Sequence, residues 1–279
     1  VVHCHDLDTL SIGVMLKKKY SIKLIYDAHE IFAYMIERVT NKCVVGGAFI
    51  LEKILLRYVD HIITVNKPLH TYFSSRSPKP ISIVMNCKQL ISKEYQPPPS
   101  NIFTVIYIGT LHKNRMFPQL IDTIGFLSDI KLILAGQKGS LYELVKQKSS
   151  QYPNIEFLGT ISTTEVIPKT LKSNAVICMI NPTDKNNKLG LANKQFEAMV
   201  CARPIITTKG TYAGRLTHKL CCGLVIDYNK SALREAILKL KNNPKMCEEF
   251  GKNALGAAIN KYNWENEESK LLEVYSSLA

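Results

Sequence analysis

Short apolar segments alternate with stretches of helical periodicity along most of the 279-residue chain, and this alternation limits the possible folds more than any other feature. Residues 22–26, 103–108 and 155–159 are apolar segments of strand length. Several such segments are followed directly by glycine or polar residues, and helical patterns stand between them. Strands that alternate with helices form parallel sheets covered by helices on both faces. The sequence therefore predicts a doubly wound α/β protein.

A proline-rich connector indicates two domains. Residues 96–100 read Gln-Pro-Pro-Pro-Ser, a composition that favours a stiff, extended spacer. The chain starts with Val1 inside an expected strand, so we expect residues 1–95 to be the C-terminal part of an N-terminal Rossmann-like domain that is incomplete. Residues 96–261 are expected to form a second Rossmann-like domain, and residues 262–279 have the pattern of an amphipathic helix.

The composition excludes several classes of protein. With 46% hydrophobic and 21% charged residues the chain is not a disordered one. The net charge of +13 is spread along the chain and suits nucleic acid, an anionic membrane surface or an anionic substrate. Basic stretches interleaved with aromatic residues are missing, so no nucleic-acid partner is expected. None of the eight cysteines forms a C-x-x-C pair, which favours reduced thiols in a cytoplasmic protein.

The most informative stretch for function is 181–208, in which a polar, turn-rich loop leads into a helix and then a short strand. Asn193 is a plausible N-cap for the helix. Free N–H groups and the helix dipole attract an anion to such an N-terminus, and Lys194 adds a positive charge. Glu197, one turn further on, can accept hydrogen bonds from two neighbouring hydroxyl groups, as on a ribose. A nucleoside diphosphate suits this layout.

This stretch is similar to the donor-binding motif of glycosyltransferase family 4, whose members are retaining, nucleotide-sugar-dependent enzymes with the GT-B fold. The family motif has two glutamates eight positions apart. Glu197 matches the second glutamate, which in the family contacts the ribose, and Leu189 stands in place of the first. The resemblance implies two Rossmann-like domains with parallel sheets and a final helix, residues 262–279, that crosses back to the N-terminal domain.

A second match to the family begins at Gly109. The family pattern is a strand, Gly, Arg and, several residues later, Lys, with both bases on the donor diphosphate. Here Gly109 matches, Thr110 replaces the arginine, and Arg115 stands where the lysine is expected. A guanidinium group can bind phosphate with two hydrogen bonds.

Further donor-site residues follow from glycines and from the loop before the helix. Gly136 and Gly139 leave room for a flat ring, so we interpret them as the wall for the nucleobase. A simple strand-to-helix turn is the alternative for this pair. Leu191 and Ala192 precede Asn193 in the loop and are expected to line the donor site with it.

Histidines near the start of the chain admit two interpretations. His5 resembles the family histidine that lies over the donor sugar, and His29 is a weaker candidate of the same kind. The run His3-Cys4-His5-Asp6 also suits a catalytic metal in a hydrolase, but the further histidine ligands that such a site needs are not evident. We therefore expect no metal and no cofactor, with the nucleotide sugar as substrate.

The sequence leads to the hypothesis of a retaining glycosyltransferase that moves a sugar from a UDP- or GDP-linked donor to a glycan or lipid-linked acceptor. His5, Arg115, Lys194 and Glu197 are its candidate catalytic residues. The basic surface suits a cytoplasmic protein at the inner face of the membrane. Two alternatives stay open: a non-catalytic protein that binds nucleotide or a partner glycosyltransferase, favoured by Leu189 and Thr110, and a sugar-nucleotide epimerase on the same fold.

Overall fold

The computed structural model describes residues 1–279 and contains two sheets in which all strands are parallel. The chain folds into two compact units. The first unit consists of Val1–Asn86, Leu189–Leu191 and Trp264–Ala279, and the second of Cys87–Lys188 and Ala192–Asn263. The sequence predicts a boundary between residues 95 and 96, whereas the first unit's N-terminal segment ends at Asn86, so the proline-rich segment lies within the second unit.

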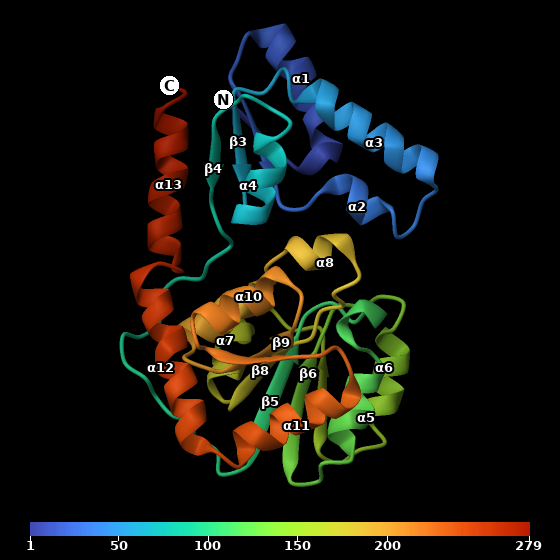
Figure 1. Ribbon diagram of the computed structural model, residues 1–279, viewed down its shortest axis with the longest axis vertical. Coiled ribbons are helices and arrows are strands. Elements are labelled where there is room, and N and C mark those ends of the chain that lie inside the picture. The colour runs from blue at the N-terminus through green and yellow to red at the C-terminus, as the bar shows by residue number, and fades with distance from the viewer. The chain divides into compact units, whose positions relative to one another are not determined.

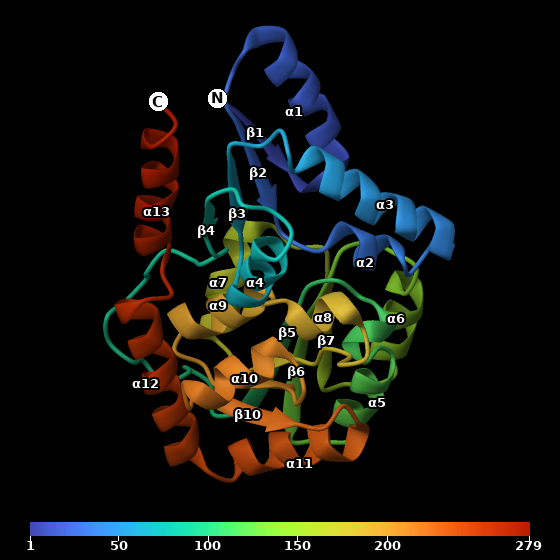
Figure 2. The same ribbon diagram turned by 45° about the horizontal axis from the view of Figure 1, so that its top comes forward.

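The first unit contains a four-stranded sheet with the strand order β1-β2-β3-β4. Its elements are β1 (Val2–His5), α1 (Asp6–Tyr20), β2 (Leu24–Ala28), α2 (Phe32–Ile36), α3 (Lys42–Leu55), β3 (His61–Thr64), α4 (Lys67–Ser74), β4 (Ile81–Ile83) and α13 (Trp264–Ser276). Helices α1 and α3 lie on one side of this sheet and α13 lies on the other (Figures 1 and 2). The side chains of β2 show why both faces are covered.

Alternate residues of β2 belong to two different cores, because successive side chains of a strand point to opposite faces. Leu24 and Tyr26 are fully buried in the core that includes residues of α1 and α3. Ile25 lies in the core on the other face, against Val274 of α13. The C-terminal helix is therefore part of the first unit although more than 170 residues separate it from β4 in the sequence.

The second unit contains a six-stranded sheet with the order β10-β9-β8-β5-β6-β7. Its strands are β5 (Phe103–Ile108), β6 (Ile130–Ala135), β7 (Ile155–Gly159), β8 (Ala175–Cys178), β9 (Ile205–Thr208) and β10 (Gly223–Ile226). Its helices are η1 (Lys113–Arg115, a 3₁₀ turn), α5 (Gln119–Gly125), α6 (Tyr142–Ser149), α7 (Thr163–Leu171), α8 (Lys185–Leu189), α9 (Asn193–Val200), α10 (Tyr212–Lys219), α11 (Lys230–Lys241) and α12 (Pro244–Asn260).

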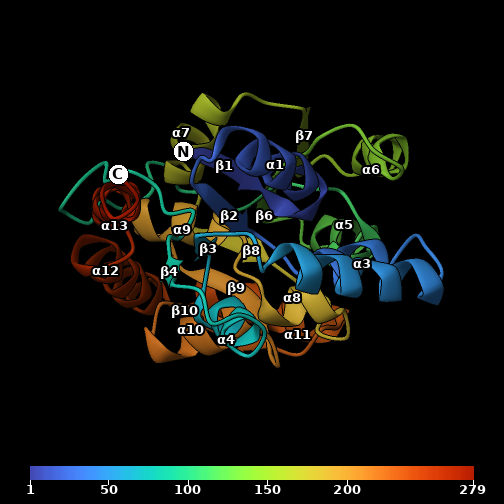
Figure 3. The same ribbon diagram turned by 90° about the horizontal axis from the view of Figure 1, so that it is seen from above.

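Helices cover both faces of the second sheet. Helices α5 and α11 pack against one another on one face, and α7 lies on the other, where it packs against α9 (Figure 3). The strand order places β5 in the centre, with β6 on one side and β8 on the other. The chain first adds strands on one side of β5 and later adds them on the other. Such a switch point leaves a crevice at the carboxyl ends of the strands, which is where open α/β sheets bind ligands.

Two further observations complete the description of the chain. No helix is both long enough and apolar enough to serve as a membrane span. None of the eight cysteines forms a disulfide bond, and five of them are buried.

Candidate functional site

A cavity of about 320 Å³ opens at the carboxyl ends of β5, β6 and β7, next to the N-terminus of α9. All of its lining residues belong to the second unit. They are Ile108, Gly109, Thr110, Arg115, Gly136, Gln137, Thr160, Ile161, Thr163, Val166, Ala192, Asn193, Lys194 and Glu197. The cavity thus joins loops from four separate places in the sequence, with two cationic side chains and one carboxylate among its walls.

Two glycines make the floor of this cavity possible. Gly109 has φ of 147°, a conformation that side-chain-bearing residues rarely adopt, and a Cβ atom there would lie 3.0 Å from Nζ of Lys194. Gly136 approaches the first glycine closely, so that a Cβ atom would lie 2.5 Å from the Gly109 carbonyl oxygen. A larger residue at position 109 would displace the side chain of Lys194, and one at position 136 would displace the backbone of Gly109. Either change would push the loops after β5 and β6 apart.

The N-terminus of α9 faces this cavity without a side-chain cap. The N-cap residue is Ala192, which offers no hydrogen bond, and Asn193 is the first helical residue. The prediction that Asn193 caps the helix is therefore wrong by one position. The methyl side chain of Ala192 cannot accept a hydrogen bond, so the N–H groups of Asn193 and Lys194 stay available for a ligand in the cavity, while the N–H of Gln195 donates to the carbonyl oxygen of Ala192.

Lys194 contributes a buried positive charge at this helix end. The side chain is 7% exposed, and its Nζ lies 3.8 Å from the centroid of the Tyr107 ring. Burial lowers the pKa of Lys194 to about 8. The ammonium group forms no ion pair with a carboxylate, and an anion in the cavity would add to its contact with the ring of Tyr107.

Arg115 is held in place by α8. Its Nη1 donates to Oδ1 of Asn187 at 2.7 Å, and Asn187 is itself buried. The neighbouring Asn114 donates at 3.1 Å to a carboxylate oxygen of Asp184, the residue directly before α8. The polar stretch after β8 was expected to be a loop throughout, but it contains α8, which positions this arginine beside the cavity.

Glu197 is the carboxylate of the site. Burial raises its pKa, and the ammonium group of Lys88, whose Nζ lies 3.6 Å from Oε1, partly offsets this effect. The side chain is 12% exposed. A carboxylate with a single lysine partner keeps acceptor capacity for the hydroxyl groups of a ligand.

The structure brings together most of the residues that the sequence singled out. Eight of the predicted site residues line the cavity: Gly109, Thr110, Arg115, Gly136, Ala192, Asn193, Lys194 and Glu197. Gly139 is exposed and is not part of the lining, and Leu191 belongs to the first unit. His5 also belongs to the first unit.

Several lining residues had no signal in the sequence. Thr160, Thr163 and Val166 come from the segment after β7 and the start of α7, a helix that was not predicted. Lys88 reaches Glu197 from more than 100 residues away. A glycine at the end of β7 was the only hint, since the ends of parallel strands meet at one edge of a sheet.

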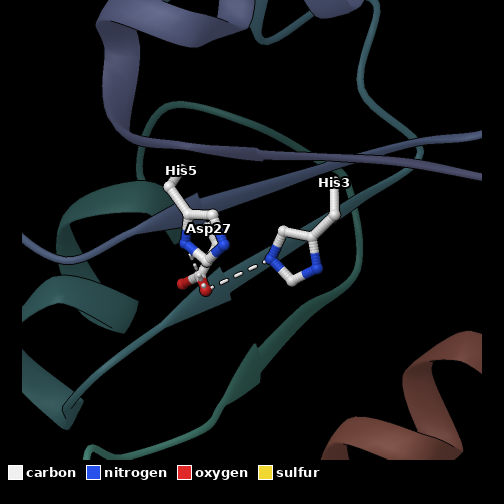
Figure 4. A group of neighbouring side chains, drawn as sticks. All are labelled: His3, His5 and Asp27. Carbon is white, nitrogen blue, oxygen red and sulfur yellow. Dashed lines mark hydrogen bonds and ion pairs between the residues drawn. The ribbon is translucent and has the colours of Figure 1, made fainter.

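The first unit gathers a different set of side chains around Asp27. Figure 4 shows His3 and His5, from alternate positions of β1, pointing toward the carboxylate of Asp27 on β2. His29 approaches the same carboxylate oxygen at 3.4 Å. Burial acts to raise the pKa of Asp27, but hydrogen bonds with His29 and His3 outweigh it and lower the pKa to about 2.

Comparisons with known proteins were made for the sequence and for the fold. Residues 102–243 match the family described as glycosyl transferases group 1. No curated protein matches the chain.

Among solved structures, sucrose-phosphate synthase from Thermosynechococcus elongatus is similar, with a TM-score of 0.79 and 17% identity over 99% of this chain and 73% of that chain. HepE of Anabaena in complex with UDP-glucose gives a TM-score of 0.79 and 17% identity over 99% of this chain and 79% of that one. A glycosyltransferase from Rickettsia africae gives a TM-score of 0.66 and 13% identity over 98% and 81% of the two chains. The predicted α/β fold of the GT-B class is confirmed by these matches.

Proposed function

The chain belongs to the group 1 glycosyltransferases, and we propose that its second unit binds the diphosphate of a UDP- or GDP-linked sugar in the cavity at the N-terminus of α9. The reaction we propose is a transfer with retention of anomeric configuration to a glycan or lipid-linked acceptor. The net charge of +13 supports activity at an anionic membrane surface. One observation carries the proposal: Arg115, Lys194 and an uncapped helix end converge on a single cavity that also contains a carboxylate.

Charge stabilisation is the main chemical contribution of these groups. When the bond between sugar and diphosphate breaks, negative charge develops on the leaving phosphate oxygens. The guanidinium group of Arg115, the ammonium group of Lys194 and the N–H donors of α9 are fixed before the reaction and stabilise that charge without reorganisation. Since these positive groups are part of the protein, the proposed step needs no metal at the diphosphate.

Glu197 is proposed to hold the ribose. Its carboxylate stands one helical turn after the N-terminus of α9, so it lies beside the position of the diphosphate rather than on it. A carboxylate there would repel a phosphate group but accept from two vicinal hydroxyl groups. The cavity volume of about 320 Å³ falls at the small end of the range for small-molecule sites, as expected for part of a larger ligand.

Leu189 favours a second candidate, a protein that binds nucleotide without transferring a sugar. This leucine is half-buried, and its carbonyl oxygen accepts a hydrogen bond from Asn66 at 3.1 Å. An aliphatic side chain offers neither a charge nor a hydrogen bond to a sugar. Such a protein would keep the binding site for the diphosphate but would lack a carboxylate at position 189. It would bind the nucleotide sugar without transferring the sugar.

Calorimetric titration of the chain with UDP and GDP tests the binding proposal. We expect one of the two nucleotides to bind with micromolar affinity, and we expect Arg115→Ala and Glu197→Ala to weaken it about tenfold or more, the effect of losing a charged hydrogen bond. Arg234→Ala, which removes an exposed arginine from α11, is the matched control and should bind as the parent does. A folded parent chain that binds neither nucleotide would refute the proposal.

Turnover separates the two candidates. The chain is incubated with the donor of the preferred base and a mixture of lipid-linked and free glycan acceptors, and release of the nucleoside diphosphate is followed together with glycan mass. A product that is one sugar larger establishes transfer, and NMR of its anomeric proton tests retention. Nucleotide binding without release or product would support the non-catalytic candidate.

A further inference from the structure

We propose that His3, His5, His29 and Asp27 form a binding site for a divalent metal ion of the zinc class within the first unit. Sequence reasoning rejected a metal near His3 and His5 because further histidine ligands were not evident. The structure supplies the missing histidine, His29, and replaces Asp6 by Asp27 as the carboxylate.

Strand pairing builds this cluster. In the parallel pair of β1 and β2, His5 stands opposite Asp27 and His3 stands opposite Ile25. Residues two apart on a strand share a face, so His3, His5 and Asp27 all lie on one side of the sheet. His29 follows β2 by one residue. Three of the four side chains are thus fixed on regular strands, which hold ligand atoms more precisely than loops do.

Four of the six distances between the proposed ligand atoms match those of a tetrahedral site. Bonds of 2.0–2.2 Å from a central zinc to nitrogen or oxygen place adjacent ligand atoms about 3.3–3.6 Å apart. From Oδ2 of Asp27, the distances are 3.2 Å to Nε2 of His3, 3.3 Å to Nδ1 of His5 and 3.4 Å to Nε2 of His29. Nδ1 of His5 and Nε2 of His29 are also 3.3 Å apart. These edges agree with the tetrahedron to within about 0.1 Å.

The carboxylate of Asp27 has an unused acceptor. Its Oδ1 atom is buried and has no hydrogen-bond partner, although Oδ2 is contacted by three imidazole rings. A buried carboxylate oxygen normally has a partner, so this atom leaves acceptor capacity on Asp27 that the three imidazole rings do not use. The side chain of His5 is 63% exposed, which leaves a route for an ion from solvent to the cluster.

Outer partners hold two of the rings. Nδ1 of His3 lies 2.7 Å from the hydroxyl group of Tyr275 on α13, so this ring can donate there while Nε2 binds a metal. Nδ1 of His29 lies 3.3 Å from the side-chain amide nitrogen of Asn86, which holds this ring by a second contact. Metal-binding histidines usually donate their second N–H group, as His3 can to Tyr275.

Asp6 connects the end of β1 to the segment that follows β2. It has φ of 57°, an unfavourable conformation for a residue with a side chain, and its Oδ1 accepts from the backbone N–H of His29 at 3.0 Å. This contact fixes the segment after β2 relative to the segment after β1. Asp6 therefore positions His29, and it is not counted among the ligands.

The donor set selects the class of metal. Three imidazole nitrogens and one carboxylate oxygen suit zinc and its neighbours in the first transition row, whereas magnesium and calcium prefer oxygen ligands. The alternative is that the four residues form a hydrogen-bonded network that binds no ion.

Titration of the metal-free chain with zinc chloride tests the site, with cobalt(II) as a spectroscopic probe of geometry. The chain should carry Cys43→Ser and Cys221→Ser, because these are its two exposed thiols and would otherwise bind zinc themselves. We expect one zinc per chain, the visible absorption of tetrahedral cobalt, and a rise in Tm with zinc. His5→Ala, Asp27→Asn and His29→Ala should each weaken zinc binding at least tenfold.

Control variants make the outcome decisive. His70→Ala removes a histidine of α4 in the same unit, and His218→Ala removes an exposed histidine of the second unit; both should bind zinc as the parent does. His5→Ala changes a largely exposed side chain, so it should stay folded even if Asp27→Asn does not. The absence of stoichiometric zinc, or zinc affinity unchanged in His5→Ala and His29→Ala, would overturn the proposal in favour of the metal-free network.

Discussion

The two parallel sheets of this chain both have polar residues at the carboxyl ends of their strands, but we propose that the two edges bind ions of opposite sign. In the second unit this edge carries Arg115, Lys194 and an uncapped helix N-terminus. In the first unit it carries three histidines around the carboxylate of Asp27. The same architecture thus carries a proposed anion site in one unit and a proposed cation site in the other, and a few side chains decide which.

The backbone brings the charged groups together in a different way at each edge. The anion site needs close approach of two loops, which Gly109 and Gly136 permit, and it uses backbone N–H groups together with side chains. The cation cluster uses side chains alone, and the register of β1 and β2 places them. The comparison predicts that changes in one cluster should leave ligand binding at the other unaffected.

The largest effect is expected from reversing the charge at Arg115. Arg115→Glu places a carboxylate beside the proposed diphosphate, so both the lost hydrogen bonds and the new repulsion weaken binding. We expect the affinity for the preferred nucleotide to fall about 100-fold or more, measured by calorimetry. Zinc affinity should stay the same, and Arg234→Glu on the exposed face of α11 is the matched control. Nucleotide affinity that falls equally in both variants would point to the net charge of the protein rather than to the cavity.

Lys194→Met should separate binding from stability. A buried ammonium group is costly, and replacing it with an apolar side chain of similar length removes that cost. We expect the free energy of unfolding to rise by about 1 kcal/mol or to stay constant, while nucleotide affinity falls about 10–100-fold. Urea denaturation and calorimetry measure the two quantities. A loss of both stability and affinity would show that Lys194 is a structural residue of α9.

The pH dependence of the anion site should follow Lys194. Its pKa of about 8 means that the amine is mostly charged at pH 7 and mostly neutral at pH 9. We therefore expect nucleotide affinity to fall several-fold between these pH values, and Lys194→Met should remove most of this slope.

Stability should change in the opposite direction over a neighbouring pH range. The pKa of Lys194 is about 8 in the folded protein, and lysine has a pKa of about 10.4 in unfolded chains. The unfolded state therefore binds more protons between these values, so the contribution of Lys194 to stability increases as the pH rises from about 8 to about 10.4. Equal slopes of unfolding free energy in the parent chain and in Lys194→Met would contradict this assignment.

The smallest effect is expected at Glu197 and depends on the ligand. Glu197→Gln keeps the size of the side chain and removes its charge, so the hydrogen bonds from ribose weaken. We expect about a tenfold loss of affinity for the nucleoside diphosphate and less than a twofold change for inorganic pyrophosphate, which has no ribose. Equal losses for both ligands would mean that Glu197 acts on the diphosphate through the charge of the site.

Some parts of the fold follow directly from local sequence. The strands Phe103–Ile108 and Ile155–Gly159 were predicted with the bounds that the structure shows, because each is a short, largely apolar run with a clear break at its end. Helix α8 was missed, since five residues rich in asparagine and lysine have no apolar periodicity. The cap of α9 was assigned one residue too late because asparagine is the more usual cap and alanine gives no such signal.

By itself, the sequence determined the α/β class and most residues of the anion site, because Gly109, Arg115, Lys194 and Glu197 stand next to strand ends and helix starts that local patterns reveal. Only the tertiary structure decided which distant groups meet. The pairing of Glu197 with Lys88 and the convergence of His5, His29 and Asp27 depend on strand order and register. Register is fixed by long-range packing of both sheet faces, and a one-residue shift would turn these side chains to the opposite face.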